Sequence, residues 1–153
     1  MASIDRSDPV ILGHVLAEHQ DLFNRLTAAR KAFAAEEPPA TARVASLQTC
    51  LSSLRDHLNE HFTQEDRGGF LEEAVARMPR LGSAVAGLVA EHPALLAELD
   101  KIIASLPSSG KSSAAWQQAG HSFSAFADRM LAHERSENAV VQEGYNEDLG
   151  LVD

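Results

Sequence analysis

Two histidine–glutamate pairs with identical spacing are the residues of this chain best suited to chemistry. His61 precedes Glu65, and His133 precedes Glu137, by four positions in each case. Residues four apart in an α-helix lie on one face, one turn from each other. Each pair would therefore present an imidazole nitrogen and a carboxylate to the same partner. Imidazole and carboxylate donors without thiolate suit iron, manganese or zinc, so the spacing predicts a metal site.

Two further histidines extend the candidate ligand set. His19 and His92 each interrupt a row of apolar residues that recur at alternating spacings of three and four. One polar residue on an apolar helix face is usually a hydrogen-bonded core residue, but here each of four separate segments supplies a histidine. The six predicted ligands are His19, His61, Glu65, His92, His133 and Glu137. Metal coordination would offset the cost of burying the two carboxylates, which is several kcal/mol for an unpaired ion.

Six side chains exceed the needs of one ordinary site, so the sequence predicts two metal ions. With Glu65 and Glu137 as bridges, each ion would receive two histidine nitrogens and two carboxylate oxygens. About two of the roughly six positions of an octahedral ion would then stay open. Water, dioxygen, peroxide or nitric oxide could occupy them.

Four long helices must position these residues. Prolines and loop-forming residues interrupt the chain between four segments with helical periodicity of apolar residues. The predicted helices span residues 9–35, 40–67, 81–106 and 112 to about 143. The connections between them are short, which favours antiparallel neighbours. We therefore predict an all-α fold, an antiparallel up-and-down four-helix bundle.

Two shorter segments complete the predicted organisation. Gly68 and Gly69 interrupt the second helix, and residues 70–78 read as a short helical piece that covers one end of the bundle. The acidic tail from residue 145 to 153 is expected to be loose. We therefore expect one domain over residues 1–153, with its core at about 9–143.

Composition narrows the possible partners and compartment. A length of 153 residues suits one domain, and the net charge of −9 would repel a phosphate backbone or an anionic lipid surface. We therefore expect neither nucleic acid nor membrane as a partner. The start of the chain lacks the apolar segment of a signal peptide, so we expect a cytoplasmic protein. The one cysteine, Cys50, falls one position off its apolar row and is expected to be a buried small hydrophobic residue.

The predicted ligands lie in motifs that resemble the hemerythrin/HHE cation-binding family. Segments 61–65 (HFTQE) and 133–137 (HERSE), with the Glu-His dipeptides at 18–19 and 91–92, carry the resemblance across all four predicted helices. It implies an antiparallel four-helix bundle around a non-haem di-iron centre of the Fe–O–Fe type, although manganese or zinc is also compatible with the donors. The implied metal ligands are His19, His61, His92 and His133, with Glu65 and Glu137 as bridges.

One departure from the family pattern shapes the functional prediction. Oxygen-carrying hemerythrins have two histidines four residues apart on the third helix. Here the residues four before and four after His92 are Leu88 and Leu96. The ligand set is more similar to HHE proteins associated with iron or oxygen sensing and with redox or nitric oxide responses. We therefore predict a di-iron protein that binds or senses oxygen, peroxide or nitric oxide.

Two alternatives stay open. One is a di-iron oxidoreductase that reduces nitric oxide or decomposes peroxide, which steady turnover with a reductant would reveal. The other is a helical interaction protein, stabilised by its metal, that acts through an unidentified protein partner. Such a protein would show no response to small ligands.

The remaining histidines receive less specific predictions. His57 lies one turn before His61 and could replace the missing ligand, but it flanks the apolar row, so a hydrogen bond to a ligand is preferred over direct ligation. His14 and His121 lie off their apolar rows and are expected on the surface.

Three carboxylates adjoin ligands in sequence and are expected in solvent, because adjacent helical residues point about 100° apart. They are Glu18, Glu60 and Glu91.

Overall fold

The computed structural model describes residues 2–34, 41–107 and 113–150, with side chains described between 13 and 145. Within these segments the chain is helical and has no strand, so the all-α prediction is confirmed. The elements are α1 (Ala2–Phe33), α2 (Thr41–Asp66), α3 (Phe70–Arg77), the 3-10 turn η1 (Pro79–Leu81), α4 (Gly82–Ser105) and α5 (Ser113–Gly150). None of the helices within the described segments combines the length and apolarity needed to cross a bilayer.

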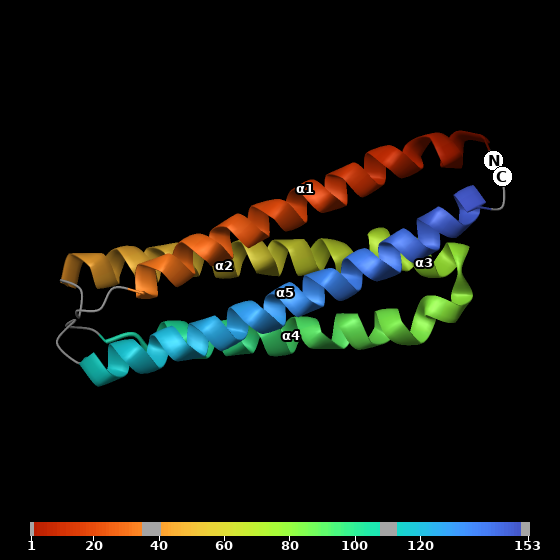
Figure 1. Cartoon of the computed structure of the whole chain (residues 1–153). Helices are drawn as coiled ribbons and strands as arrows, with labels where there is room; N and C mark the ends of the chain where they lie inside the picture. The colour runs from red at the N-terminus through yellow and green to blue at the C-terminus, as the bar shows by residue number, and fades with distance from the viewer. Residues whose placement is uncertain (1, 35–40, 108–112, 151–153) are drawn as a thin grey trace.

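The four long helices form a bundle, and α3 lies at one end of it (Figure 1). Helix α1 packs against α2 and α5, and α4 packs against the same two helices, so a common interior lies between all four. Helix α3 packs mainly against α5. Side chains on the inward faces of four different elements can therefore meet.

The predicted helix boundaries are accurate in the middle of the chain and wrong towards its ends. The helix predicted at 81–106 is observed as α4, within one residue at each end, and the predicted end at 67 lies one residue from the end of α2. Helix α1 begins at Ala2 instead of residue 9, because a proline removes one backbone hydrogen bond without ending this helix. The predicted boundaries at 35, 40 and 112 lie outside the described residues.

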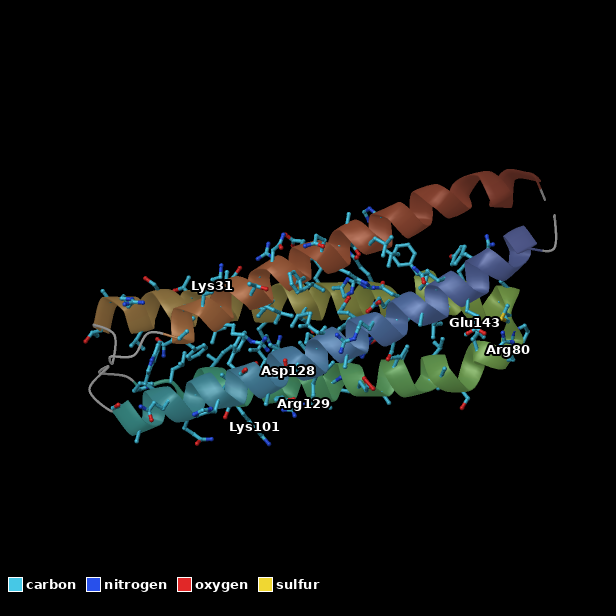
Figure 2. The ribbon with its side chains drawn as sticks, viewed as in Figure 1. Lys31, Arg80, Lys101, Asp128, Arg129 and Glu143 are labelled. Atoms are coloured by element: carbon cyan, nitrogen blue, oxygen red, sulfur yellow. The ribbon has the colours of Figure 1, made fainter. Side chains whose placement is uncertain are left out.

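The prediction of a loose tail is wrong over residues 145–150, and its remainder at 151–153 lies outside the described residues. Helix α5 continues to Gly150, and Tyr145 is only 1% exposed. The guanidinium carbon of Arg77, on α3, lies 4.2 Å from the centre of the Tyr145 ring. Figure 2 shows Arg80 and Glu143 beside each other at this end, where they form an ion pair. The short helix thus gives the end of α5 a surface to pack against.

The candidate ligands separate two apolar clusters along the bundle. On α5, Met130 belongs to the larger cluster and Val140 to the smaller one, which lies under α3. His133 and Glu137 fall between them in sequence, and both are buried. The polar residues are therefore enclosed by apolar packing on both sides along the bundle axis.

The Gly68-Gly69 pair ends α2 immediately beyond the candidate ligands. Gly68 has a φ of +95°, a left-handed conformation that favours glycine. A Cβ atom on Gly69 would lie 3.2 Å from the Cα atom of Glu65. The pair lets the chain turn closely past Glu65 into α3.

We expect replacement of Gly144 with alanine to destabilise the protein by about 1 to 3 kcal/mol through overpacking. A Cβ atom at this position of α5 would lie 2.8 Å from the Cβ atom of Ala74 on α3. Urea unfolding monitored by circular dichroism measures the change. Gly87→Ala is the matched control, because a Cβ atom there meets nothing within 4 Å. Since alanine is the better helix former, we expect Gly87→Ala to stabilise the protein slightly, and equal effects of the two substitutions would contradict the packing argument.

Candidate metal centre

All six predicted ligands are buried in the bundle interior. Their exposed fractions are His19 7%, His61 6%, Glu65 6%, His92 1%, His133 2% and Glu137 1%. Helix α1 contributes one of them, α2 two, α4 one and α5 two. The structure therefore collects, from four helices, residues that are far apart in the sequence.

The donor atoms form two groups that could each hold a metal ion. One group contains His19, His61, Glu134 and Glu137, and the other contains His92, His133 and Glu137. Within each group the donor atoms lie within 4.8 Å of one another, and Glu137 belongs to both. Glu65 Oε1 lies 3.4 Å from His61 Nε2 and 3.5 Å from His92 Nε2, between the groups. Glu137 is thus shared by the two groups, whereas Glu65 lies between His61 and His92 without belonging to either group.

Glu134 is a seventh candidate ligand that the sequence analysis missed. Its side chain comes from α5, is 5% exposed and places Oε2 at 2.7 Å from His19 Nε2. A sequence signal existed, because Glu134 lies seven residues after Ala127 and seven before Val141, both of which are buried. Such a heptad column widens the inward face of α5 beyond a single row. The carboxylate beside His133 therefore belongs to the interior.

Each of the four candidate histidines faces an oxygen acceptor on a neighbouring helix through Nδ1. The pairs are His19 with Asn138 (2.6 Å), His61 with Glu18 (3.5 Å), His92 with Asp66 (2.9 Å) and His133 with Glu91 (2.8 Å). In helix terms, α1 pairs with α5, α5 with α4, α4 with α2, and α2 with α1. These four contacts connect each helix to the next around the bundle. Each imidazole is held with its Nε2 atom facing the interior.

Glu91 is exposed, as predicted, and Glu18 is only partly exposed, but both also face core imidazoles, which the sequence analysis did not predict. A residue 100° from the core direction of a bundled helix points towards the adjacent helix, so these carboxylates reach imidazoles there. All four acceptors directly precede or follow a predicted ligand in sequence, as Asp66 follows Glu65. That adjacency was the available signal. Glu60 is exposed, as predicted.

Among the described residues, no hydrogen-bond donor lies opposite the inward-facing Nε2 atoms of the four histidines. A neutral imidazole has one ring proton, and the acceptors at Nδ1 favour its position there. His19 Nε2 then faces Glu134 Oε2 at 2.7 Å, and His133 Nε2 faces Glu137 Oε1 at 3.0 Å, as pairs of acceptors. The buried atoms without a hydrogen-bond partner include all four histidine Nε2 atoms and oxygens of Glu65, Glu134 and Glu137. A proton or a metal cation is needed between such atoms.

The other predicted residues lie outside the centre. His57 is partly exposed and places Nε2 at 3.6 Å from Asp21 Oδ2, so the structure directs this atom towards Asp21 and not towards a ligand. His14 and His121 are exposed, as predicted. Cys50 is exposed, so its expected burial is wrong, because a position just off the inward face of α2 reaches solvent.

Burial changes the proton affinities of the candidate ligands. Burial, reinforced by the neighbouring Glu137 carboxyl, raises the pKa of Glu65 to about 11. Burial likewise raises the pKa of Glu137 to about 8. Burial lowers the pKa of His61 and His92, which favours the neutral imidazole that a metal requires. Burial also acts to lower the pKa of His19, but Glu134 and Asn138 outweigh it, so the net shift is upward.

In the metal-free protein, we expect the contribution of Glu65 and Glu137 to stability to fall as the pH rises above 4.5, while the lowered pKa values of His61 and His92 act in the opposite direction up to pH 6.5. Both glutamates have folded-state pKa values above the ordinary value of 4.5, so their protonated forms favour folding. Their contribution is complete below pH 4.5 and falls up to about pH 8 for Glu137 and about pH 11 for Glu65. Thermal melts of chelator-treated protein between pH 5 and pH 8 measure this slope. Glu65→Gln should flatten it, and an unchanged slope in that variant would contradict the role of Glu65.

No protein-family model, curated protein or solved structure matches this chain. The residues and their geometry are therefore the basis for a functional assignment.

Proposed function

We propose that this chain is a single-domain, hemerythrin-like protein that holds two irons and binds or senses oxygen, peroxide or nitric oxide. We also infer that its helices follow the antiparallel up-and-down order. The packing of α1 and α4 each against both α2 and α5 supports this order, as does the resemblance of the motifs at 61–65 and 133–137.

The observation that carries the proposal is a set of inward-facing donor atoms with no hydrogen donors between them. Four imidazole Nε2 atoms and oxygens of three carboxylates are buried without hydrogen-bond partners. Isolated buried carboxylates are costly, and this cost falls when a cation lies between them. Two groups that share Glu137 accommodate two cations better than one.

Among the metals that these donors suit, the family resemblance favours iron. Nitrogen and oxygen donors without thiolate also admit manganese and zinc. When bound, two iron ions would supply reversible redox change and coordination positions for small ligands. The oxygen acceptors that face Nδ1, three of them at hydrogen-bond distance, would orient the imidazoles and raise their basicity.

The apolar surroundings suit the exclusion of water from such a centre. The Phe62 ring stacks on the His92 ring with centroids 4.1 Å apart and lies 5.7 Å from that of His133. Phe62 itself belongs to the larger apolar cluster. Metal binding is favoured over general acid–base catalysis because the four candidate histidines are buried, with each Nε2 atom facing a carboxylate oxygen.

Metal content per chain tests the proposal directly. The protein is expressed with added iron, purified without metal-affinity chromatography and analysed for its elements. We expect about two irons per chain and a lower content in His61→Ala, whereas the exposed His121→Ala serves as a matched control with unchanged content. About one zinc per chain, or no stoichiometric metal, would overturn the proposal.

Optical spectra distinguish the proposed binding role from turnover. The reduced protein is exposed to oxygen and, separately, to nitric oxide. A stoichiometric spectral change supports binding or sensing. Sustained consumption of nitric oxide or peroxide with a reductant would instead identify an oxidoreductase, and the absence of any response in an iron-loaded protein would leave the metal a structural role.

A further inference from the structure

The two halves of the candidate centre differ in their number of donors. Besides the shared Glu137, one group has three side chains of its own, and the other has only His92 and His133. Glu65 does not remove this difference, because its Oε1 atom is almost equally far from His61 and His92. On the proposed function, the half formed by α4 and α5 has fewer protein donors and thus more room for an external ligand.

The side with fewer donors adjoins a pocket between α4 and α5. This pocket, which we call the α4–α5 pocket, has a volume of about 280 Å³ and reaches His133 and its acceptor Glu91. Its walls include the small residues Ala94 and Ala132. Such a pocket has room for a small molecule beside the less fully coordinated half.

An ion pair spans the rim of the α4–α5 pocket. Arg129, on α5, donates to Glu98, on α4, with Nε 2.9 Å from Oε2. Both residues line the pocket, and Arg129 is labelled in Figure 2. These two charges offset each other, and the Glu91 carboxylate adds a negative charge to the lining, so the pocket disfavours an anion and is compatible with an uncharged ligand.

A second pocket lies on the other side of α5, between α1 and α5. This α1–α5 pocket has a volume of about 330 Å³ and is lined by His19, Glu134 and Gln20, among others. It approaches the group that already has three donors of its own. The Glu134 carboxylate therefore lies between this pocket and the centre as a donor, which leaves less room for an added ligand.

We propose that a small uncharged ligand, of the size of a diatomic molecule, enters through the α4–α5 pocket and binds on the His92–His133 side of the centre. This inference rests on the proposed di-iron function. It assigns Ala94 and Ala132 as the residues whose small size keeps the entry open.

Bulky substitutions in the two pockets test the entry route. Ala132→Trp fills the α4–α5 pocket, and Gln20→Trp is the matched control in the α1–α5 pocket; both positions are exposed. The iron-loaded, reduced proteins are mixed with nitric oxide in a stopped-flow spectrometer. We expect Ala132→Trp to slow association by about tenfold or more, and Gln20→Trp to have little effect. Iron content and melting temperature are measured on the same samples.

Ala94→Trp, from the facing helix, gives an independent block at a second exposed position. Slower association in both alanine variants, with iron content retained, supports the route. Equal rates in all variants, equal slowing in the two pockets, or slowing only in Gln20→Trp would overturn it. A wild-type protein without two irons or without a nitric oxide response would instead refute the proposed function, so the two failures are distinguishable.

Discussion

Replacing Glu137 with alanine is expected to lower the metal content from about two ions per chain to less than about one, because this carboxylate belongs to both donor groups. Its side chain is 1% exposed and has no hydrogen-bond partner at either carboxylate oxygen. Loss of Glu137 removes a donor from each half at once. Elemental analysis of the purified variant measures the result.

Two other glutamates of α5 provide the controls for Glu137→Ala. Glu134 belongs to one donor group only, so Glu134→Ala should weaken binding of one ion and retain the other. Glu143 pairs with Arg80 away from the centre, so Glu143→Ala should keep the wild-type content. Circular dichroism confirms that each variant is folded. Retention of both ions by folded Glu137→Ala would contradict the shared-ligand geometry.

Removal of the metal is expected to lower the melting temperature by on the order of 10 to 20 °C at neutral pH. A ligand that binds only the folded state stabilises it in proportion to the logarithm of its excess over Kd, and two sites add their contributions. The metal-free interior also retains buried donor atoms of seven side chains without hydrogen-bond partners. Paired thermal melts with iron and with a chelator under reducing conditions measure the difference.

Two histidine variants test whether the difference in melting temperature comes from metal bound at the centre or from the iron and chelator in solution. His121→Ala, at an exposed position, should keep the full difference between the loaded and chelated proteins. His92→Ala should reduce it, because His92 is a candidate ligand. Equal melting temperatures with and without metal in the wild type would show that the ions do not stabilise this fold.

The sequence alone determined the helical fold and six of the candidate ligands. The apolar rows repeat at three and four residues, so any helix that buries such a row must also bury the histidine within it. The four-residue spacing of His61 and Glu65 places both on that buried face. These predictions depend only on local geometry and on the burial of apolar surface.

The way in which neighbouring helices complete the centre depends on their packing and could not be predicted from the sequence. The pairing of His61 with Glu18 and of His133 with Glu91 depends on which helices are adjacent, which no single helical pattern contains. The order of α5 beyond residue 143 likewise depends on α3, against which Tyr145 packs.

The two donor groups differ in their number of side chains, and this difference also depends on how the helices pack. Glu134 lies beside His133 in sequence, yet its carboxylate reaches His19 on α1. Helical periodicity fixes the direction of a side chain relative to its own helix axis. The packing of the bundle decides which donor lies opposite it, because the rotation and the neighbours of each helix are set by contacts between elements distant in sequence.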